Sequence, residues 1–534
     1  MTNPSTALAR EVVTALVRSG VTEVVIAPGS RNAPLSFAVY DAAEAGLLRL
    51  HTRVDERSAG FLALGLTRGG SRAAVMCTSG TAVANLHPAV LEAAHAGLPL
   101  VLVTADRPAR LRGTNANQTT DQVGIFGRLV ETRDLAGPMP ELDEALATAT
   151  GPVHLNVQLD EPLVPDGRWT PTVERGQRSE PATPEPATPA RPATIAVGPR
   201  TVVVAGDEAG PPARVLAQRA GWPLLAEPTS GSRTGDNALR CYRLLLDTEL
   251  GEQIERVVVF GHPTLSRPVT RLLARDDVEV LAVPAAGVWN EGPYRVGAVL
   301  DGGAEPERPD DPTWLESWRD ADRAVGRRLD ALLGAEEGTT PHEVAGAVSR
   351  AVPPGGLLVV GASSPIRDLD LMVARYAVGD RRKVVANRGL SGIDGVVSTA
   401  IGAALGRAHG SRNLALMGDV TFLHDAAGLV LGPHEPRPDL TIVVVNDDGG
   451  SIFAMLEQGD AAYADRFDTL FGTPHGVDLA SLCAATRTPH WKVESVAELE
   501  HALASPNGGI EVVEVAVRRD NRRDLDARIR GLRP

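Results

Sequence analysis

Cysteines and long apolar runs are scarce in this chain of 534 residues. The cysteines, Cys77, Cys241 and Cys483, show no C-x-x-C spacing, which argues against a disulfide framework or a zinc site and favours a reduced, cytoplasmic setting. No apolar stretch is long enough to span a bilayer, and Arg10, Glu11 and Arg18 interrupt the beginning of the chain. We therefore expect neither a membrane anchor nor a signal peptide.

Positive charge is also limited. The formal net charge is -14, whereas nucleic acids and anionic membranes attract proteins with clustered positive charge. We therefore expect no nucleic acid and no membrane as a partner, and any binding of anions should be local. Lysine occurs only at Lys383 and Lys492, so nearly every cation is an arginine. A single arginine in a pattern is correspondingly weak support for a function.

Apolar, β-branched runs alternate with helical patterns along most of the chain. Continuous apolar strands separated by helices are typical of parallel sheets that are covered on both faces. The chain is too long for one core and should hold about three domains. We predict an α/β chain of three doubly wound parallel-sheet domains in series. The expected ranges are a first domain at 1–169, a linker rich in Pro, Thr and Glu at 170–196, a central domain at 197–338 and a last domain at 339–534.

Two apolar runs of the last domain end in aspartate. Asp419 follows residues 414–417, and Asp447 follows residues 441–445. A crossover helix that includes residues 426–431 would return the second strand parallel to the first, so both carboxylates would lie at one edge of the sheet. Two carboxylates at one edge suit a hard cation such as Mg²⁺. An aspartate after a strand is also a common cap or turn residue, and this alternative stays open for each one alone.

This region resembles the thiamine-diphosphate motif, in which Gly-Asp-Gly and Asn-Asn follow two neighbouring strands. It departs from the motif at Val420, in place of the last Gly, and at Asp447, in place of the second Asn. The resemblance implies thiamine diphosphate as the cofactor, with Gly418 among the residues that bind it. It also implies Mg²⁺, or Mn²⁺ as the alternative metal, on the side chains of Asp419 and Asp447 and the carbonyl of Gly449.

A glutamate segment in the first domain supports this resemblance. Residues 54–68, VDERSAGFLALGLTR, are similar to the glutamate segment of thiamine-diphosphate decarboxylases and carboligases. The similarity implies that Glu56 is catalytic, because a glutamate on the aminopyrimidine activates the cofactor. A surface acid in a first helical turn is the alternative. Ile393 stands where such enzymes carry an apolar residue under the cofactor, although an ordinary core isoleucine fits equally well.

Four further motifs narrow the resemblance. The segments APGSRNAPL (27–35), TADRP (104–108), NANQTTDQ (115–122) and ANRGLSGIDG (386–395) together resemble the family of SEPHCHC synthases (2-succinyl-5-enolpyruvyl-6-hydroxy-3-cyclohexene-1-carboxylate synthases) of menaquinone biosynthesis. That family decarboxylates 2-oxoglutarate and adds the resulting unit to isochorismate, with both halves of a site supplied by different subunits. The resemblance implies a transferase that is a homodimer or homotetramer. The implied substrate-binding residues are Ser30, Arg31, Arg107, Asn117, Gln118, Ser363, Arg367, Arg388, Ile452 and Phe453.

Other functions remain open from the residues alone. Another thiamine-diphosphate 2-oxoacid decarboxylase, or an acetohydroxyacid-type carboligase, would keep Glu56 and Asp419 without the arginines. A nicotinamide oxidoreductase is disfavoured because VVVAGDEAG (202–210) lacks the G-x-G-x-x-G loop. For the same reason we expect no nucleotide in the central domain, whose substrate contacts stay unassigned. A binding protein without catalysis would have no need of Glu56.

Overall fold

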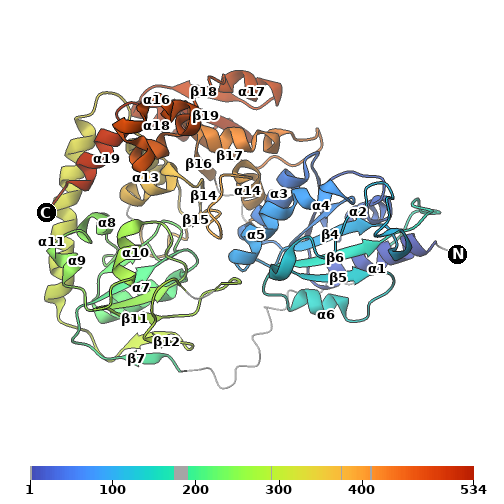
Figure 1. Cartoon of the computed structure of the whole chain (residues 1–534), viewed down its shortest axis with the longest axis horizontal. Helices are drawn as coiled ribbons and strands as arrows, with labels where there is room; N and C mark the ends of the chain where they lie inside the picture. The colour runs from blue at the N-terminus through green and yellow to red at the C-terminus, as the bar shows by residue number, and fades with distance from the viewer. Residues whose placement is uncertain (1–2, 174–190, 290–291, 374–375, 409–411) are drawn as a thin grey trace. The chain divides into compact units, whose positions relative to one another are not determined.

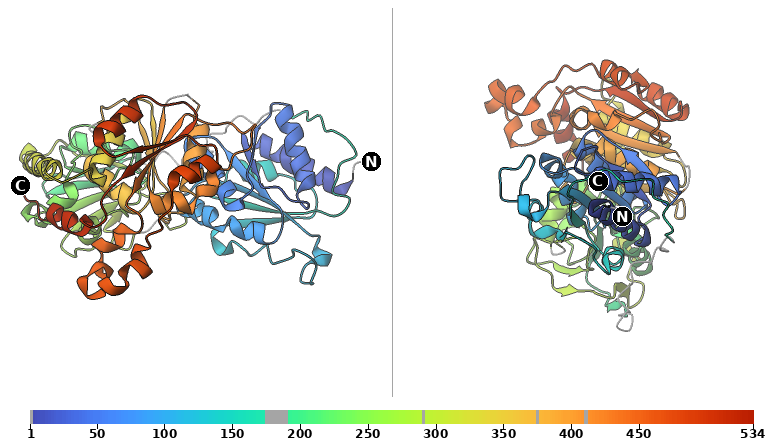
Figure 2. Two further views of the ribbon diagram at one scale, coloured as in Figure 1. Left: turned by 90° about the horizontal axis from the view of Figure 1, so that it is seen from above. Right: turned by 90° about the vertical axis from the view of Figure 1, so that its right-hand side faces the viewer.

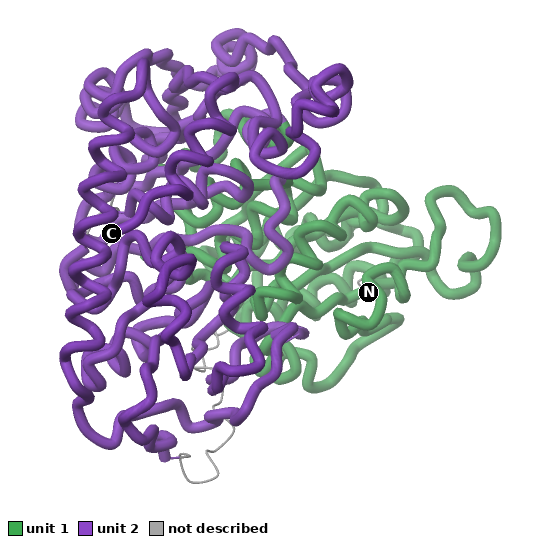
Figure 3. Tube along the Cα trace, turned by 60° about the vertical axis from the view of Figure 1, so that its left-hand side comes forward, with its two compact units in different colours: residues 1–185, 394–410, 424–438 green, residues 186–393, 411–423, 439–534 purple. Residues whose placement is uncertain are grey.

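The computed structural model describes residues 3–173, 191–289, 292–373, 376–408 and 412–534. Its contacts group the chain into two compact units, each of which is described by itself (Figure 3). Unit 1 comprises residues 1–185, 394–410 and 424–438, and unit 2 comprises residues 186–393, 411–423 and 439–534. Segments of the last third of the chain therefore belong to both units.

Unit 1 contains a six-stranded parallel sheet in the order β2-β1-β3-β4-β6-β5 (Figure 1). Most of its strands are continuous apolar runs that are buried along their whole length, as expected of a sheet that is covered on both faces. The strands are β1 (Glu23–Ile26), β2 (Arg49–Thr52), β3 (Ala73–Cys77), β4 (Val101–Asp106), β5 (Glu131–Leu135) and β6 (Val153–Gln158).

Helices cover both faces of this sheet (Figure 2). One face packs on α1 (Pro4–Arg18), α2 (Ala33–Glu44) and α6 (Leu142–Ala147). The other face carries α3 (Glu56–Gly69), which also contacts α4 (Thr81–Asn85), α5 (His87–His95) and α14 (Val396–Leu405).

Glycines allow α3 and α14 to approach closely. A Cβ on Gly65 would lie 2.2 Å from the carbonyl oxygen of Thr399, and a Cβ on Gly402 would lie 2.2 Å from that of Leu62. Only glycine leaves room for two helix backbones at such a distance. The helix that begins with Glu56 is therefore fixed against a segment from the last third of the chain.

Unit 2 contains two larger sheets. The central one has the order β12-β11-β10-β8-β9 and lies between α7 (Gly210–Ala220) on one face and α8 (Tyr242–Leu245), α10 (Arg267–Leu273) and α11 (Pro312–Gly334) on the other. The short helix α9 (Glu249–Glu252) precedes β10. The strands of the central sheet are β8 (Thr201–Ala205), β9 (Leu224–Ala226), β10 (Arg256–Phe260), β11 (Glu279–Ala282) and β12 (Ala298–Val299). A separate two-stranded sheet pairs β7 (Ala193–Ile195) with β13 (Ala304–Pro306).

The last sheet repeats the strand order of the first. It runs β15-β14-β16-β17-β19-β18, all parallel. One face packs on α12 (Pro341–Ala351), α13 (Ser364–Met372) and α18 (Val496–Ala504). The strands are β14 (Leu357–Val360), β15 (Lys383–Val385), β16 (Asn413–Gly418), β17 (Leu440–Asn446), β18 (His490–Val493) and β19 (Ile510–Ala516). Further helices are α15 (Asp419–His424), α16 (Ala464–Phe467), α17 (Leu479–Ala485) and α19 (Arg522–Arg530).

The three predicted parallel α/β sheets are confirmed, whereas the predicted crossover helix is wrong. Between β16 and β17 the chain forms α15 and a short 3₁₀ turn at Ala426–Leu429, not one helix through residues 426–431. Gly428 and Gly432 interrupt the helical pattern, and prolines follow. Residues 174–190 of the predicted linker lie outside the described residues. The three cysteines are buried and form no disulfide, and no helix of the described residues is long and apolar enough to cross a membrane.

Candidate active site

The predicted site residues lie where strands end, and they fall into two groups. Unit 1 holds Ser30, Arg31, Glu56, Arg107, Asn117 and Gln118, and unit 2 holds the others. In the first and last sheets the strand order reverses at β1/β3 and at β14/β16. Open parallel sheets bind ligands at such switch points. Ser30 and Arg31 follow β1, while Ser363 follows β14 and Asp419 follows β16.

The carboxylate edge of the last sheet is formed by Asp419 and Asp447. The strands β16 and β17 pair in parallel, with Gly418 opposite Val445, so both aspartates lie at the same edge as predicted. Asp419 accepts hydrogen bonds from the backbone N–H of Val420 at 2.7 Å and of Gly449 at 2.9 Å. Its orientation is thereby set by the backbone that follows each strand.

Two negative charges are held together at this edge. Burial and the neighbouring Asp419 raise the pKa of Asp447 to about 7, and burial also raises the pKa of Asp419. Neither carboxylate forms a salt bridge with Arg or Lys of the described residues, and a divalent cation would balance both charges. No group of three or more His, Cys, Asp or Glu suited to a metal occurs among the described residues. The donor set here has two carboxylates and backbone carbonyls, which suits a metal that keeps water and phosphate ligands.

A histidine contacts Asp419 of this pair. The Nδ1 of His475 accepts a hydrogen bond from the N–H of Val477 at 3.0 Å, so its Nε2 carries the proton that is donated to Asp419 Oδ2 at 3.1 Å. The backbone of Gly449 has φ of 140°, and a Cβ there would lie 2.1 Å from the oxygen of Gly472. Only glycine fits this position.

A cavity in unit 2 brings together residues that were predicted from separate motifs. Its lining combines apolar side chains with the carboxylates of Asp419 and Asp447, which is the usual composition of a cofactor pocket. The predicted residues that line it are Ser363, Ile393, Gly418, Asp419, Asp447, Gly449, Ile452 and Phe453.

Glu56 is the first residue of α3, in unit 1. The side chain of Asp55 caps this helix by accepting the N–H of Ser58 at 2.9 Å. Asp425 accepts from the hydroxyl of Ser58 at 3.1 Å and from the N–H of Ser398 at 2.6 Å, which ties the starts of α3 and α14 together. Glu56 itself is half-buried and accepts a hydrogen bond from Asn85 at 3.1 Å. A carboxyl group on such a fixed helix end is well placed to act on a ligand.

Arginines occur in like-charged pairs in both groups. Burial and the charge of Arg31 lower the pKa of Arg107. In unit 2, burial and the charge of Arg388 lower the pKa of Arg367. Like charges disfavour one another, and an anion that binds beside them relieves this repulsion. Each pair therefore suits a carboxylate ligand.

Two predicted substrate residues have strained backbones. Gln118 has φ of 56° and Ser363 has φ of 72°, in the left-handed region that side chains other than glycine rarely adopt. Such strain concentrates at functional sites. The carbonyl of Ser363 accepts from Arg367 Nη1 at 2.6 Å, so the strained turn and the arginine position one another. Ser30 and Asn117 are exposed.

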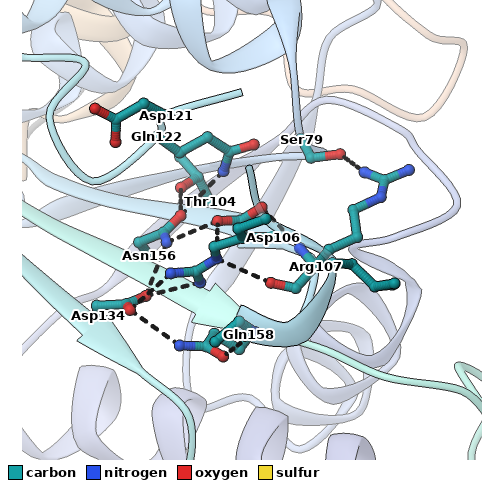
Figure 4. A network of polar contacts seen from close by, with 12 residues as sticks. Ser79, Thr104, Asp106, Arg107, Asp121, Gln122, Asp134, Asn156 and Gln158 are labelled. Atoms are coloured by element: carbon teal, nitrogen blue, oxygen red, sulfur yellow. Dashed lines mark hydrogen bonds and ion pairs between the residues drawn. The ribbon is translucent and has the colours of Figure 1, made fainter. Parts of the chain in front are cut away.

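A buried polar network lies beneath Arg107 (Figure 4). The carboxylate of Asp106 accepts from the backbone N–H of Arg107 at 2.7 Å, from Asn156 Nδ2 at 3.0 Å and from Arg112 Nε at 3.0 Å. Arg112 also binds both oxygens of Asp134, at 2.8 and 2.9 Å. The guanidinium of Arg107 donates to Ser79 Oγ and, at 3.2 Å, to the carbonyl of Gln118.

Gln122 joins this network to the start of α4. Its Oε1 accepts from the N–H of Gly80 at 2.9 Å, and its Nε2 donates to Asn156 Oδ1 at 3.0 Å and to the carbonyl of Ala105 at 3.2 Å. The loop that carries Asn117 and Gln118 is thus connected to the ends of β4 and β6. Gln122 and Asp106 stand inside motifs that the sequence shows, but their roles depend on Asn156, which no motif includes.

Comparison with known proteins agrees with this geometry. A family model described as thiamine pyrophosphate enzyme, N-terminal TPP binding domain, matches residues 6–125, and the corresponding C-terminal TPP binding domain matches residues 368–515. A Nocardioides protein named 2-succinyl-5-enolpyruvyl-6-hydroxy-3-cyclohexene-1-carboxylate synthase is 73% identical, over 99% of this chain and 98% of the relative. The chain belongs to the SEPHCHC synthase family.

Two further members of this family show how far the similarity extends. Proteins of the same name from Kineococcus radiotolerans and Saccharopolyspora erythraea are 48% and 44% identical, and each comparison covers 99% of this chain and 98% of the relative. The matched domains make the chain a thiamine-diphosphate enzyme. The family resemblance that was seen in its motifs is thereby confirmed, while the individual site residues stay predictions.

Two residues that contact the site are not predicted from the sequence. His475 lies in an irregular segment after β17, and Thr264 lies in the central domain, where its Oγ1 accepts from Arg388 Nη2 at 2.8 Å. No strand pattern or motif marks either residue. Only the folded chain shows that they contact predicted site residues.

Proposed function

We propose that this chain forms SEPHCHC for menaquinone biosynthesis, by decarboxylating 2-oxoglutarate and adding the remaining four-carbon unit to isochorismate, with release of carbon dioxide. The observation that carries this proposal is the 73% identity, over 99% of this chain, to a protein named as a SEPHCHC synthase, and it is supported by Arg107 and Arg367, whose pKa values are lowered by burial and by the charges of Arg31 and Arg388. Both substrates carry two carboxylates, and a guanidinium binds a carboxylate through two hydrogen bonds and keeps its charge at any relevant pH. Because the net charge of the chain is -14, arginines that gather locally are a stronger indication of an anion-binding site.

The metal is proposed to be Mg²⁺, with Mn²⁺ as the alternative. The ligands from the protein would be the side chains of Asp419 and Asp447 and the backbone carbonyl of Gly449. Their fit rests on the raised pKa of Asp447, about 7, which burial and a second carboxylate produce and which a cation would reverse. Gly418 and Ile393 line the same cavity and would contact the cofactor.

Each group of predicted site residues would have its own role in the reaction. Thiamine diphosphate, when bound, supplies the electron sink that decarboxylation of a 2-oxoacid requires. Glu56 would hold a proton at the aminopyrimidine of that cofactor, and Ile393 would pack against the cofactor from the cavity wall. The arginines would orient the carboxylates of both acids, helped by the polar side chains of Ser30, Asn117, Gln118 and Ser363. Ile452 and Phe453 would exclude water from the reacting atoms.

We also propose that the enzyme is a cytoplasmic homodimer or homotetramer. Glu56 and the metal ligands belong to different compact units of the chain, and SEPHCHC synthases resemble other thiamine-diphosphate enzymes in completing a site from two subunits. Light scattering of the purified protein at several concentrations tests this. A monomer that retains full activity would contradict it.

Reconstitution tests the function. The purified protein is mixed with Mg²⁺, thiamine diphosphate, 2-oxoglutarate and isochorismate, each omitted in turn, while isochorismate loss and carbon dioxide release are followed. We expect both signals only in the complete mixture and in equal amounts. Carbon dioxide without isochorismate loss, or a preference for pyruvate, would point to another thiamine-diphosphate decarboxylase or carboligase and overturn the substrate assignment.

A further inference from the structure

The central sheet meets a predicted substrate residue at the carboxyl ends of its strands. Thr264 follows β10, and its Oγ1 accepts a hydrogen bond from Nη2 of the buried Arg388 at 2.8 Å. The switch point of this sheet lies between β8 and β10, and there the chain itself fills the crevice. A Cβ on Gly206 would lie 2.1 Å from the carbonyl carbon of His262.

Two contacts fix the loop that carries Thr264. Asp207 and His262 exchange backbone hydrogen bonds, at 3.1 and 3.0 Å. The N–H of Leu265, next to Thr264, donates to Glu227 Oε1 at 2.9 Å. Glu227 follows β9 and is 2% exposed, and its Oε2 has no hydrogen-bond partner among the described residues. Such an unpaired oxygen on a buried acid calls for an explanation.

We propose that Glu227 is a positioning residue of the substrate site, which fixes Thr264 through the N–H of Leu265 and so orients the guanidinium of Arg388 toward a substrate carboxylate. This inference rests on the proposed function. It gives the central domain a role in binding one of the two acids, although the domain has no phosphate loop.

The charge around Glu227 supports this role. Burial raises the pKa of Glu227 to about 8, while Arg388 acts in the opposite direction. The other groups that face it are Asp370 of α13 and Asp207 after β8, which raise its pKa further, and the phenol of Tyr242 of α8. Below pH 8 the neutral carboxyl leaves the positive charge of Arg388 free for a substrate. As the pH rises through 8, the carboxylate forms and cancels that charge.

The test compares three variants with a matched control. Thr264→Val removes the acceptor of Arg388, Glu227→Leu removes the acceptor of Leu265, and Glu227→Gln keeps an acceptor but cannot ionise. Thr229→Val is the control, because Thr229 also follows β9, is buried, and its Oγ1 has no hydrogen-bond partner among the described residues. Each protein is titrated with 2-oxoglutarate and with isochorismate without thiamine diphosphate, and its KM, kcat and cofactor affinity are then measured.

We expect Thr264→Val and Glu227→Leu each to raise the Kd and KM for one acid about tenfold, with kcat and cofactor affinity within about twofold. The double variant, which combines Thr264→Val with Glu227→Leu, should lose no more affinity for the acid than the weaker-binding single variant, since both changes act on the orientation of the Arg388 guanidinium. Binding by the wild type should weaken between pH 7 and 9, whereas Glu227→Gln should bind the acid normally at pH 7 and should not show this weakening. Thr229→Val should behave as the wild type.

Several results would overturn the proposal. Unchanged Kd and KM in Thr264→Val would remove the role of this contact, and a pH profile of Glu227→Gln that matches the wild type would remove the role of charge. An equal loss of cofactor affinity and substrate affinity would show a structural effect only. If Glu227→Leu does not fold, the other two variants still decide. An inactive wild type that binds both acids, with the expected effects on Kd, would contradict the proposed function and leave this inference standing.

Discussion

Asp106 in unit 1 is the last residue of the parallel strand β4 and Asp447 in unit 2 directly follows the parallel strand β17, but different groups surround them. Arg112 Nε lies 3.0 Å from Asp106 Oδ2, and Asn156 donates to the same oxygen at 3.0 Å. Asp447 instead shares its edge with Asp419, and burial and this second negative charge raise its pKa to about 7. A carboxylate with a guanidinium partner is already balanced, whereas two carboxylates together favour a cation.

This difference separates structural from functional carboxylates. In the sequence both aspartates appear at the end of an apolar run, and a cap or turn explains either one. In the folded chain, Asp106 has a guanidinium partner and holds a loop in place, while Asp447 has none among the described residues and lines the predicted cofactor site. Glu56 is more like Asp447, because within the described residues its carboxylate accepts a hydrogen bond from the neutral Asn85 and forms no salt bridge with Arg or Lys.

The largest effect is expected for Glu56→Gln. The variant should lose about 10²–10⁴-fold in kcat, the usual contribution of a general acid or base, while its affinity for thiamine diphosphate stays within about threefold. Stopped assays of isochorismate loss and a cofactor titration measure the two quantities. Unchanged turnover would show that Glu56 has no catalytic role, and that the lack of a cationic partner does not mark a functional carboxylate.

Asp106→Asn should act on stability. It removes one of the two carboxylate charges that Arg112 contacts, so the free energy of unfolding should fall by about 2 kcal/mol. Denaturant unfolding followed by circular dichroism measures this. Cofactor affinity should be retained, and a variant that is as stable as the wild type would show that the network in Figure 4 contributes no net stability.

Glu435 also has cationic partners, and it provides a pH-dependent test of a structural carboxylate. The carboxylate is buried, which disfavours its charge, but hydrogen bonds from His51 and Thr52 and the charge of Arg53 together lower its pKa to about 2. Because the pKa is lowered in the folded protein, this carboxylate stabilises the fold above about pH 4.5, and that stability is lost as the pH falls toward 2. Glu435→Gln should therefore lower the unfolding free energy by about 2 kcal/mol at pH 7 and by progressively less toward pH 3. A difference that is constant with pH would contradict the assignment.

The smallest effect is expected for Asp447→Asn. The same chemical change as in Asp106→Asn should here have the opposite sign, raising the stability of the metal-free protein at pH 8 by about 1 kcal/mol, because it removes a repulsion. Asparagine offers a metal an oxygen ligand as well, so activity should persist at a higher Mg²⁺ concentration. Thermal unfolding with a chelator present checks the first point. A clear loss of stability would place Asp447 in the structural class.

Much of the fold follows from the apolar runs. The strands of the three sheet centres are continuous apolar segments, whereas the edge strands β5 and β18 read ETRDL and HWKV, and each buries only its last residue. An edge strand with polar side chains gives no apolar signal. The helix expected at residues 426–431 fails because glycines and prolines interrupt it.

The sequence predicts those site residues that stand in short motifs. Ser30, Arg31 and Arg107 stand in short segments with a recognisable pattern, and so do the carboxylates after β16 and β17. Asn156, Thr264 and Glu227 are not predictable, because each acts through a contact with a residue more than a whole element away in the chain. Such contacts exist only once the sheets form.

In the proposed function, Arg31 and Arg107 in unit 1 and Arg367 and Arg388 in unit 2 orient the carboxylates of the two acids, and one measurement tests this most directly. The KM values for 2-oxoglutarate and for isochorismate are determined in the wild type, in Arg107→Met and in Arg367→Met. We predict that each variant raises the KM for one acid about tenfold or more and leaves the other within about threefold, with the affected acid differing between the two variants. Unchanged KM values for both acids, or activity with pyruvate at the rate seen with 2-oxoglutarate, would contradict the account.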